Sequence, residues 1–256
     1  MPCRSPRRRA APVALAVTLA LAIVAPAPAR AESALAGELR EIATRYHEDL
    51  PRIDRLYRDL TQAVKTDAGV DNWIALAHVC FIWGDVRART PEEKLEAYER
   101  GREAGKCATE LAPRQALGHF WLATNAGRWG QTKGVMRSLF LLPTVKEEMQ
   151  LALELDPKLV GAYSLAGSVY YEVPGLFGGD LDKSEEMFRK GLALDARATG
   201  LRVGLAKTLV KKNRVAEARR ELQAVLDEKQ PTNPADWTLK DAKRARELLD
   251  SLKGRS

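Results

Sequence analysis

Four segments of the chain share a short pattern that is typical of paired helices. Each carries a small residue near its middle, where a second helix can approach closely: Ala77, Thr124, Gly167 and Ala206. In three of them an aromatic residue comes four positions earlier: Trp73, Phe120 and Tyr163. A ring at that spacing lies on the same face of a helix and can pack against a neighbouring repeat. The segments read NWIALAHVCF from residue 72, GHFWLATNAG from 118, GAYSLAGSVY from 161 and GLRVGLAKTL from 200.

A second amphipathic segment follows each of these. The later three align on trios of apolar or small residues spaced four and then three apart, which places each trio on one helical face: Val145/Met149/Ala152, Ser184/Phe188/Gly191 and Ala218/Leu222/Val225. Apolar residues recur at spacings of three and four, and the alternation typical of strands is nearly absent. The sequence therefore predicts an all-α protein built from consecutive helix pairs.

These helix pairs resemble tetratricopeptide repeats. The second helix of the last pair, marked by Ala218, lies 34 residues after that of the preceding pair, which matches the period of the family. The resemblance implies a right-handed superhelix, an α-solenoid, of about four helix pairs over residues 70–230. Extra N-terminal helices are expected over residues 32–69, and a capping helix from Leu239 to Leu252 is expected within residues 231–256. Stacking supplies the core, because an isolated pair cannot bury its apolar face.

The predicted connections within the pairs differ in length. From a marker in the first helix to one in the second, nine residues separate Leu209 from Ala218, and fourteen separate Tyr170 from Ser184. The corresponding separations are eighteen and about twenty-one in the two earlier pairs. We expect the additional residues to form inserted loops on one edge of the solenoid, which is often the binding edge of repeat proteins.

The segment YEVPGLFGGD, residues 171–180, contains one such insert. Its last two residues, Gly179-Asp180, align with the turn at Asn213-Arg214 of the last pair. The true insert is therefore about five residues within Val173–Gly178. Its proline ends the first helix, and its glycines let the chain fold back. Leu176 and Phe177 are then held over the edge of the solenoid.

A narrower resemblance covers about residues 110–230. The segments GHFWLATNAGRWGQTKGVMRSLF and PGLFGGD are similar to bacterial exported tetratricopeptide proteins related to the T component of tripartite ATP-independent periplasmic (TRAP) transporters. That resemblance implies a helical homo-oligomer that assists solute uptake beside a periplasmic solute-binding protein. A weaker likeness exists to the regulator of microtubule dynamics family, which shares a helix followed by an aromatic-rich inserted loop.

Residues 1–31 have the composition of a secretory signal peptide. Four arginines precede an apolar run over residues 10–25, and Ala29-Arg30-Ala31 gives a small-x-small cleavage site. The run is shorter than the roughly 20 apolar residues of a spanning helix. We therefore expect export to the periplasm with cleavage after Ala31, which argues against the intracellular setting of the microtubule-dynamics family. Cleavage leaves 36 basic and 34 acidic residues, a balance that does not indicate nucleic-acid binding.

Cys80 and Cys107 remain after cleavage, on segments that are expected to form adjacent helices. Two interpretations stay open. They form one disulfide, as an oxidising compartment permits, or they are two buried thiols that act as small apolar residues.

No arrangement typical of an enzyme is found. His47, His78 and His119 fall in separate predicted helices, without Cys, Asp or Glu at metal-ligand spacing. The segment GQTKG, residues 130–134, lacks the order of a phosphate loop and follows no strand. Acidic pairs at 147–148 and 185–186 open predicted helices, where they suit the helix dipole, and Asp182 with Glu185 is expected to form a capping box. We predict a non-catalytic protein without a cofactor or metal.

One set of side chains gathers in or beside the two expected loops of the middle pairs: Trp121, Arg128, Trp129, Phe140, Leu176 and Phe177. Three interpretations stay open. The rings pack under the loops as additional core. Alternatively, they line a surface that holds an apolar small molecule, with Arg128 meeting an anionic group, or they receive a peptide or protein partner, the usual use of stacked helix pairs.

The sequence thus predicts an exported binding or scaffold module, in the narrower version a periplasmic accessory to solute uptake. The alternative function is a structural adaptor in a cell-envelope assembly with no small ligand.

Overall fold

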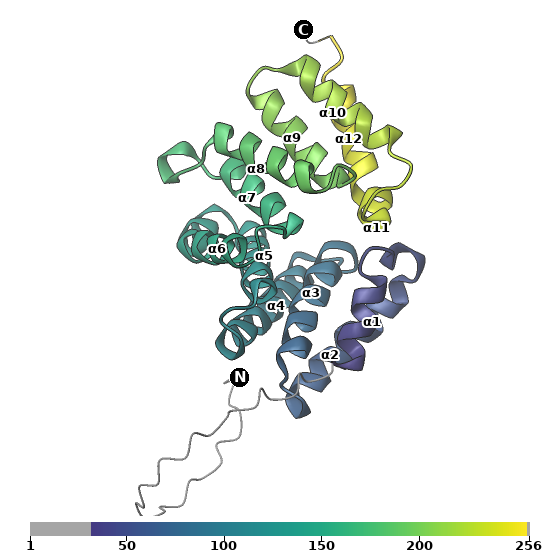
Figure 1. Ribbon diagram of the computed structural model, residues 1–256, viewed down its shortest axis with the longest axis vertical. Coiled ribbons are helices and arrows are strands. Elements are labelled where there is room, and N and C mark those ends of the chain that lie inside the picture. The colour runs from purple at the N-terminus through teal and green to yellow at the C-terminus, as the bar shows by residue number, and fades with distance from the viewer. Residues whose placement is uncertain (1–31, 255–256) are drawn as a thin grey trace, which may run out of the picture.

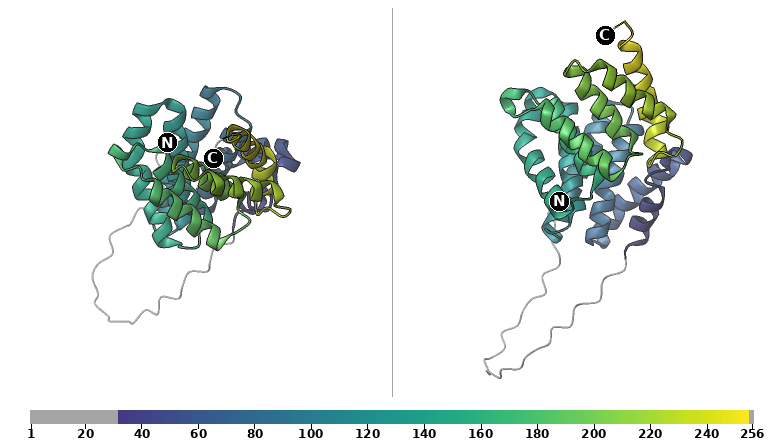
Figure 2. Two further views of the ribbon diagram at one scale, coloured as in Figure 1. Left: turned by 90° about the horizontal axis from the view of Figure 1, so that it is seen from above. Right: turned by 45° about the horizontal axis from the view of Figure 1, so that its top comes forward.

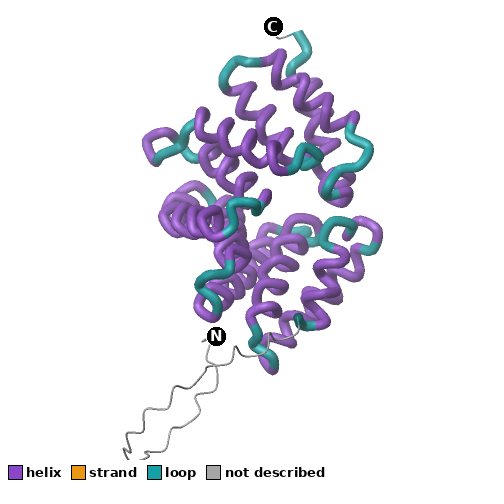
Figure 3. The backbone as a smooth tube through the Cα atoms, viewed as in Figure 1, coloured by secondary structure: helices purple, strands orange, loops and turns teal. Residues whose placement is uncertain are grey.

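The computed structural model describes residues 32–254, and over these residues the chain forms helices and connecting segments without a strand (Figure 3). The all-α prediction is confirmed. The expected signal peptide and its cleavage site, residues 1–31, lie outside the described residues. Within the described part, no helix combines the length and the apolar character needed to span a bilayer.

Four consecutive helix pairs form the body of the molecule (Figure 1). We call them units one to four, each with an inner helix followed by an outer helix. Each outer helix also packs against the next inner helix, and neighbouring inner helices contact one another, whereas the outer helices make no comparable contact among themselves. The inner helices therefore lie on the concave side of the stack. The pairs are α3 (Val70–Val86) with α4 (Pro91–Leu111), α5 (Ala116–Lys133) with α6 (Val135–Leu155), α7 (Val160–Glu172) with α8 (Leu181–Leu194), and α9 (Thr199–Lys211) with α10 (Val215–Asp227).

Additional helices lie at both ends of the stack. The N-terminal ones are α1 (Ala34–Ile42), η1 (Tyr46–Glu48) and α2 (Leu50–Thr66). The C-terminal ones are α11 (Pro234–Asp236), the π-helical η3 (Trp237–Asp241) and α12 (Ala242–Ser251), which form one nearly continuous run. The run starts earlier than the sequence pattern indicated. Figure 2 shows it beside the N-terminal helices, and the backbone N–H of Ala235 donates to the carbonyl of Thr44 at 2.9 Å.

The small residues identified in the sequence lie where helices approach closely. Ala77 and Ala206 are fully buried, and a side chain on Gly167 would overlap the ring of Phe188 from α8. The same ring lies against Gly204 of α9, where an added Cβ would come within 2.4 Å of it. Phe188 therefore joins both helices of unit three to the inner helix of unit four.

The loops expected in units one and two are largely helix, so that prediction is wrong. Gly134 alone separates α5 from α6, and four residues, 87–90, join α3 to α4. The outer helices of these units contain 21 residues each, compared with 14 in α8 and 13 in α10. The φ of Gly134 is 110°, which glycine adopts readily, so the chain reverses at this residue and continues as helix.

In unit three the insert is present as expected. In unit four the N–H of Arg214 donates to the carbonyl of Leu209 at 2.9 Å and closes a plain turn. The matching bond in unit three runs from the N–H of Asp180 to the carbonyl of Tyr170, also at 2.9 Å, and encloses five more residues. Part of the insert forms the short helix η2 (Gly175–Phe177).

The capping box expected from Asp182 and Glu185 is wrong. Asp180 is the N-cap of α8, and its carboxylate accepts from the backbone amides of Asp182 and Lys183 at 2.9 and 3.1 Å. The helix thus starts two residues earlier than expected, which releases Glu185 from a capping role.

The disulfide between Cys80 and Cys107 is absent. Cys80 is a free thiol on α3 with no exposed surface, and burial raises its pKa. Of the two open interpretations, Cys80 follows the second and acts as a small apolar core residue.

Gly105→Ala should destabilise the protein. The added Cβ would lie 2.7 Å from the backbone of Leu122 on α5, a contact that no side-chain rotation relieves, and overpacking of this kind costs about 1–3 kcal/mol. Chemical denaturation followed by circular dichroism measures the loss. Gly127→Ala is the matched control, because nothing lies within 4 Å of its Cβ and alanine favours a helix. Equal unfolding free energies for the two variants would contradict the close approach of α4 and α5.

Candidate functional site

The predicted site residues do not share one surface. Those on the inner helix α5 are buried or half-buried, and those on the outer helix α6 and on η2 are exposed. The first group is Trp121, Arg128 and Trp129, and the second is Phe140, Leu176 and Phe177. The structure therefore divides the prediction into a cluster on the concave side and an edge.

Trp121 belongs to the core of the first two units. Its ring stacks on His78 of α3 with centroids 4.0 Å apart, and it also contacts Phe81 and Phe120. Trp121 is only 8% exposed, and burial lowers the pKa of His78 to about 4. Of the three interpretations, additional core describes Trp121.

Arg128 faces a buried carboxylate on the concave side. Its guanidinium lies 2.9 Å from Asp85 of α3, to which the hydroxyl of Tyr98 donates at 2.8 Å. Burial alone would raise the pKa of Asp85, but the cations Arg128 and Lys240 outweigh burial and hold that pKa below its usual range. Arg128 also lies over the ring of Phe81 at 5.6 Å. The positive charge of Arg128 is therefore already paired with a carboxylate of the protein itself.

The C-terminal run crosses this concave cluster. We call residues 234–241, which comprise α11 and η3, the C-terminal strap. Its Lys240 lies 3.4 Å from Asp85 and 2.7 Å from Asp236. The carboxylate of Asp236 accepts a short hydrogen bond from the hydroxyl of Tyr46 in η1. The strap thus connects the inner helix of unit one to the N-terminal end of the molecule.

The far end of the strap binds unit four. The hydroxyl of Thr199 on α9 donates to Asp241 at 2.8 Å, and the indole N–H of Trp237 donates to the carbonyl of Val225. Burial raises the pKa of Asp241 to about 6. The π-helical turn lets this carboxylate face α9 while Lys240 faces α3, and π-helical turns often occur at functional sites.

Trp129 lies apart from both groups. The guanidinium of Arg102 on α4 covers its ring at 5.7 Å, and the ring is half-buried between the two helices. This contact joins units one and two and leaves only part of the ring open to solvent.

The exposed group lies on one edge of the solenoid. Phe140 and Leu176 are 76% and 90% exposed, and Phe177 is 46% exposed. Val135 and Met136, in the first turn of α6, are also exposed. We call these five residues the apolar edge. Val135 and Met136 are not among the predicted site residues, because the sequence pattern placed them in an inserted loop and not at the exposed start of a helix.

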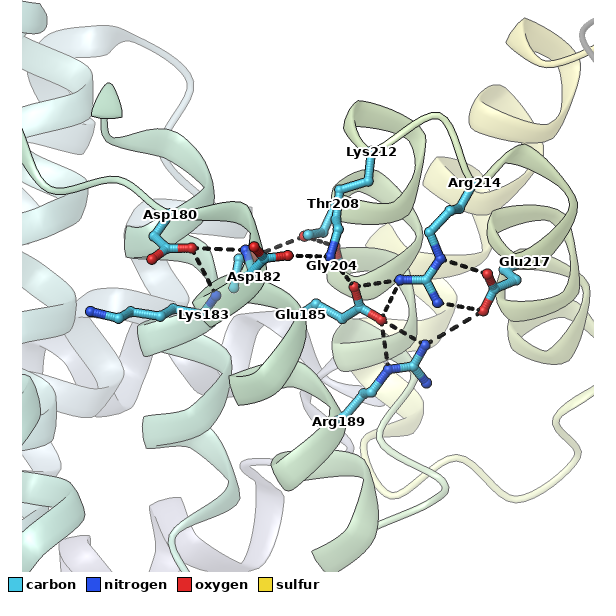
Figure 4. Close-up of polar contacts among 11 residues, drawn as sticks. Asp180, Asp182, Lys183, Glu185, Arg189, Gly204, Thr208, Lys212, Arg214 and Glu217 are labelled. Atoms are coloured by element: carbon cyan, nitrogen blue, oxygen red, sulfur yellow. Dashed lines mark hydrogen bonds and ion pairs between the residues drawn. The ribbon is translucent and has the colours of Figure 1, made fainter. Parts of the chain in front are cut away.

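A charged network lies at the turns of units three and four (Figure 4). Glu185 accepts from the guanidinium of Arg214 at 2.6 and 2.7 Å, from Lys212 at 2.6 Å and from Arg189 at 2.9 Å. Burial would raise the pKa of Glu185, but these three cations lower it to about 2. Arg214 also binds Glu217, so the network ties α8 to the turn and to the outer helix of unit four.

A buried hydroxyl pair continues this junction. Ser184 donates to the carbonyl of Gly167 at 2.8 Å and lies 2.9 Å from the hydroxyl of Thr208. The sequence marked Ser184 as a small packing residue. The structure adds that its hydroxyl bonds unit three to unit four.

The other candidate chemistry forms no reactive cluster. His119 contacts Glu148 at 2.6 Å and the carbonyl of Pro113 at 2.9 Å, so both ring nitrogens are engaged. The described residues contain no group of three or more His, Cys, Asp or Glu that could hold a metal. Two open recesses of about 400 and 500 Å³, one beside Asp54 and one beside Asp227, are lined mainly by charged side chains. Neither includes a predicted site residue.

Two protein-family models match the chain. The model described as regulator of microtubule dynamics protein 1-3 matches residues 38–176, just over half of the chain, and a tetratricopeptide repeat model matches residues 178–241. No curated protein matches the sequence. The tetratricopeptide resemblance is confirmed, whereas these matches do not confirm the resemblance to the T component of TRAP transporters.

Solved structures share the fold. The crystal structure of TTC0263, a thermophilic tetratricopeptide protein of Thermus thermophilus, superposes with a TM-score of 0.61 at 21% identity, covering 84% of this chain and 100% of that one. The MamA RS-1 ArsTM double mutant gives a TM-score of 0.46 at 16% identity, covering 87% and 99% of the two chains. The first likeness supports a tetratricopeptide solenoid, and the second is too low to carry an argument.

Glu185→Gln should lower stability by about 2 kcal/mol at neutral pH, because three cations lose their shared carboxylate. In the folded protein the pKa of Glu185 is lowered to about 2, compared with about 4.5 for the same carboxyl in the unfolded chain. The contribution of Glu185 to the unfolding free energy is therefore complete above about pH 4.5 and is lost as the pH falls toward 2. Denaturant unfolding across that range should show a shallower fall for the variant than for the wild type.

Glu186→Gln is the control for this measurement. It removes the adjacent carboxylate of α8, which forms one exposed pair with Lys190, and such pairs contribute about 0.5 kcal/mol or less. If both variants lose the same stability, the network of Glu185 does not hold units three and four together.

Proposed function

The chain belongs to the regulator of microtubule dynamics protein 1-3 family, and it has a tetratricopeptide fold. From these two findings we propose that it is a non-catalytic scaffold that binds a protein partner along its concave face. Stacked helix pairs commonly present such a face to an extended or helical segment of another protein.

One observation carries the proposal: the concave face already holds a peptide segment, the chain's own C-terminal strap. The strap meets the inner helices through an ion pair at Asp85 and a buried hydrogen bond at Thr199. These are the contacts that a partner segment would make. They indicate the chemistry that suits the face, namely charged and hydrogen-bonding groups around aromatic rings.

The surface beyond the strap remains open to a partner. Lys207 and Lys211 of α9 lie over the ring of Tyr171 at 4.7 and 3.7 Å, and Lys207 also pairs with Glu172 at 3.4 Å. This part of the inner surface combines an aromatic ring with cations near solvent. It suits an acidic or amphipathic segment better than an apolar small molecule.

The proposal includes export and a place in the cell envelope. It rests on the composition of residues 1–31, which are typical of a signal peptide cleaved after Ala31. In the periplasm, the resemblance to T components favours a solute-binding protein as the partner and a homo-oligomeric assembly. A structural adaptor without any small ligand is the second candidate. Microtubule regulation is not part of the proposal, because export would separate the chain from the cytoplasm.

Site-specific photo-crosslinking in intact cells tests the concave face. A photoreactive residue replaces Lys207 on the inner helix α9 or, as the control, Lys190 on the outer helix α8, where the side chain is also exposed. We expect a discrete crosslinked protein from position 207 and none from position 190. Identical products from both positions, or none from either, would contradict a partner on the concave face.

A further inference from the structure

The N-terminal part of α6 extends beyond the unit that should cover it. Helix α6 contains 21 residues, whereas α7 and α8 of the next unit contain 13 and 14. At 1.5 Å per residue the difference is roughly 10 Å of helix. Over that length no neighbouring unit covers the helix, and Val135, Met136 and Phe140 are 73%, 79% and 76% exposed.

The insert of unit three contacts α6 at Lys146, between one and two helical turns beyond this projecting segment. The ammonium of Lys146 on α6 donates to the carbonyl of Phe177 at 2.9 Å, and it sits in the space beside Gly178. Lys146 lies less than two helical turns from Phe140. The insert therefore adds Leu176 and Phe177 to the apolar surface of α6, and together these residues form the apolar edge.

The surroundings of the apolar edge are basic. Residues 111–146 contain no Asp or Glu but five basic residues: Arg114, Arg128, Lys133, Arg137 and Lys146. Two of them, Lys133 and Arg137, flank the start of α6 and are exposed, and neither forms an ion pair among the described residues. Elsewhere, many cations on the outer helices face a carboxylate, as Arg189 and Lys190 do. The chain thus keeps free positive charge beside its exposed apolar side chains.

We propose that the apolar edge inserts into the interfacial region of an anionic lipid bilayer, with Lys133 and Arg137 at the level of the phosphate headgroups. Apolar side chains flanked by cations are the combination that binds such surfaces, because burial in the acyl boundary adds to electrostatic attraction. A peptide partner would need a groove, and the apolar edge is a projecting end. The two recesses described above lie elsewhere, beside Asp54 and Asp227.

The proposal is independent of the concave face. The hydrogen bonds and ion pairs of the C-terminal strap described above reach Thr44 and the helices η1, α3, α9 and α10, which carry no edge residue, and the crosslinking positions 207 and 190 lie outside the edge. Loss of membrane binding and loss of a concave partner can therefore be distinguished.

Vesicle flotation tests the apolar edge. The full-length chain is produced with its own leader, and the form that accumulates in the cell is purified and mixed with vesicles of phosphatidylcholine alone or of phosphatidylcholine with phosphatidylglycerol. The wild type should float with the anionic vesicles and much less with the neutral ones. Met136→Ser with Phe140→Ser should weaken binding about ten-fold or more, because two side chains lose burial in the acyl boundary.

Two further variants separate the contributions. Lys133→Glu with Arg137→Glu should remove the preference for anionic vesicles and the sensitivity of binding to salt. Leu194→Ser is the matched control, because Leu194 is an exposed leucine at the far end of α8, and its loss should leave binding unchanged. Circular dichroism should show all variants folded, since every substituted side chain is exposed.

Four results would overturn the proposal, three of them from the flotation experiment. The wild type fails to float with anionic vesicles, the edge variant floats as well as the wild type, or the Leu194 control weakens binding equally. Analytical ultracentrifugation of the same proteins covers the remaining case. If the wild type is a dimer without lipid and the edge variant is a monomer, the apolar edge joins two copies of the chain and does not bind a membrane.

Discussion

The ring of Phe188 packs directly against the backbones of two helices. This packing is possible only because Gly167 and Gly204 lack side chains. The ring is 2% exposed and contacts the inner helix of its own unit and that of the next. Close approach at small residues recurs through the stack, as where Gly105 meets the backbone of Leu122. Because dispersion and burial both require such contact, the spacing of small and large residues determines which helices pair and how far the stack turns.

The lengths of the helices then decide which surfaces remain uncovered. A solenoid covers each unit with the next one, so a long pair followed by a short pair leaves a projecting end. The chain makes this step between units two and three: Gly134 reverses the chain within unit two, so α6 starts at once and is long, whereas α7 and α8 of unit three are short. Exposed apolar side chains at that step are a direct consequence of the mismatch. Covering them would need either longer helices in unit three or a partner surface.

Much of the architecture could be predicted from the sequence because the repeat is a local pattern. Spacing alone indicates the small residues Ala77, Gly167 and Ala206, and also the insert of about five residues within Val173–Gly178. The sequence pattern does not distinguish the extended helices from loops, because residues between two aligned markers look like an insertion whether or not they continue the helix. The pairing of Asp85 with Lys240 had no local signal, since 155 residues separate them and only the curvature of the whole stack brings them together.

The same curvature gives the two candidate surfaces different chemistry. On the concave side, the ends of the stack converge, so charges there are buried together and must be paired, as Asp85 is with Arg128 and Lys240. At the edge between units two and three the side chains face water, and Lys133 is exposed and forms no ion pair among the described residues. A partner segment that displaced the C-terminal strap would have to replace the ion pairs of Asp85, and this requirement favours specificity. At the edge, a partner meets unpaired positive charge and exposed apolar side chains. These features favour a broad partner surface without a fixed shape over a partner that fits a defined groove.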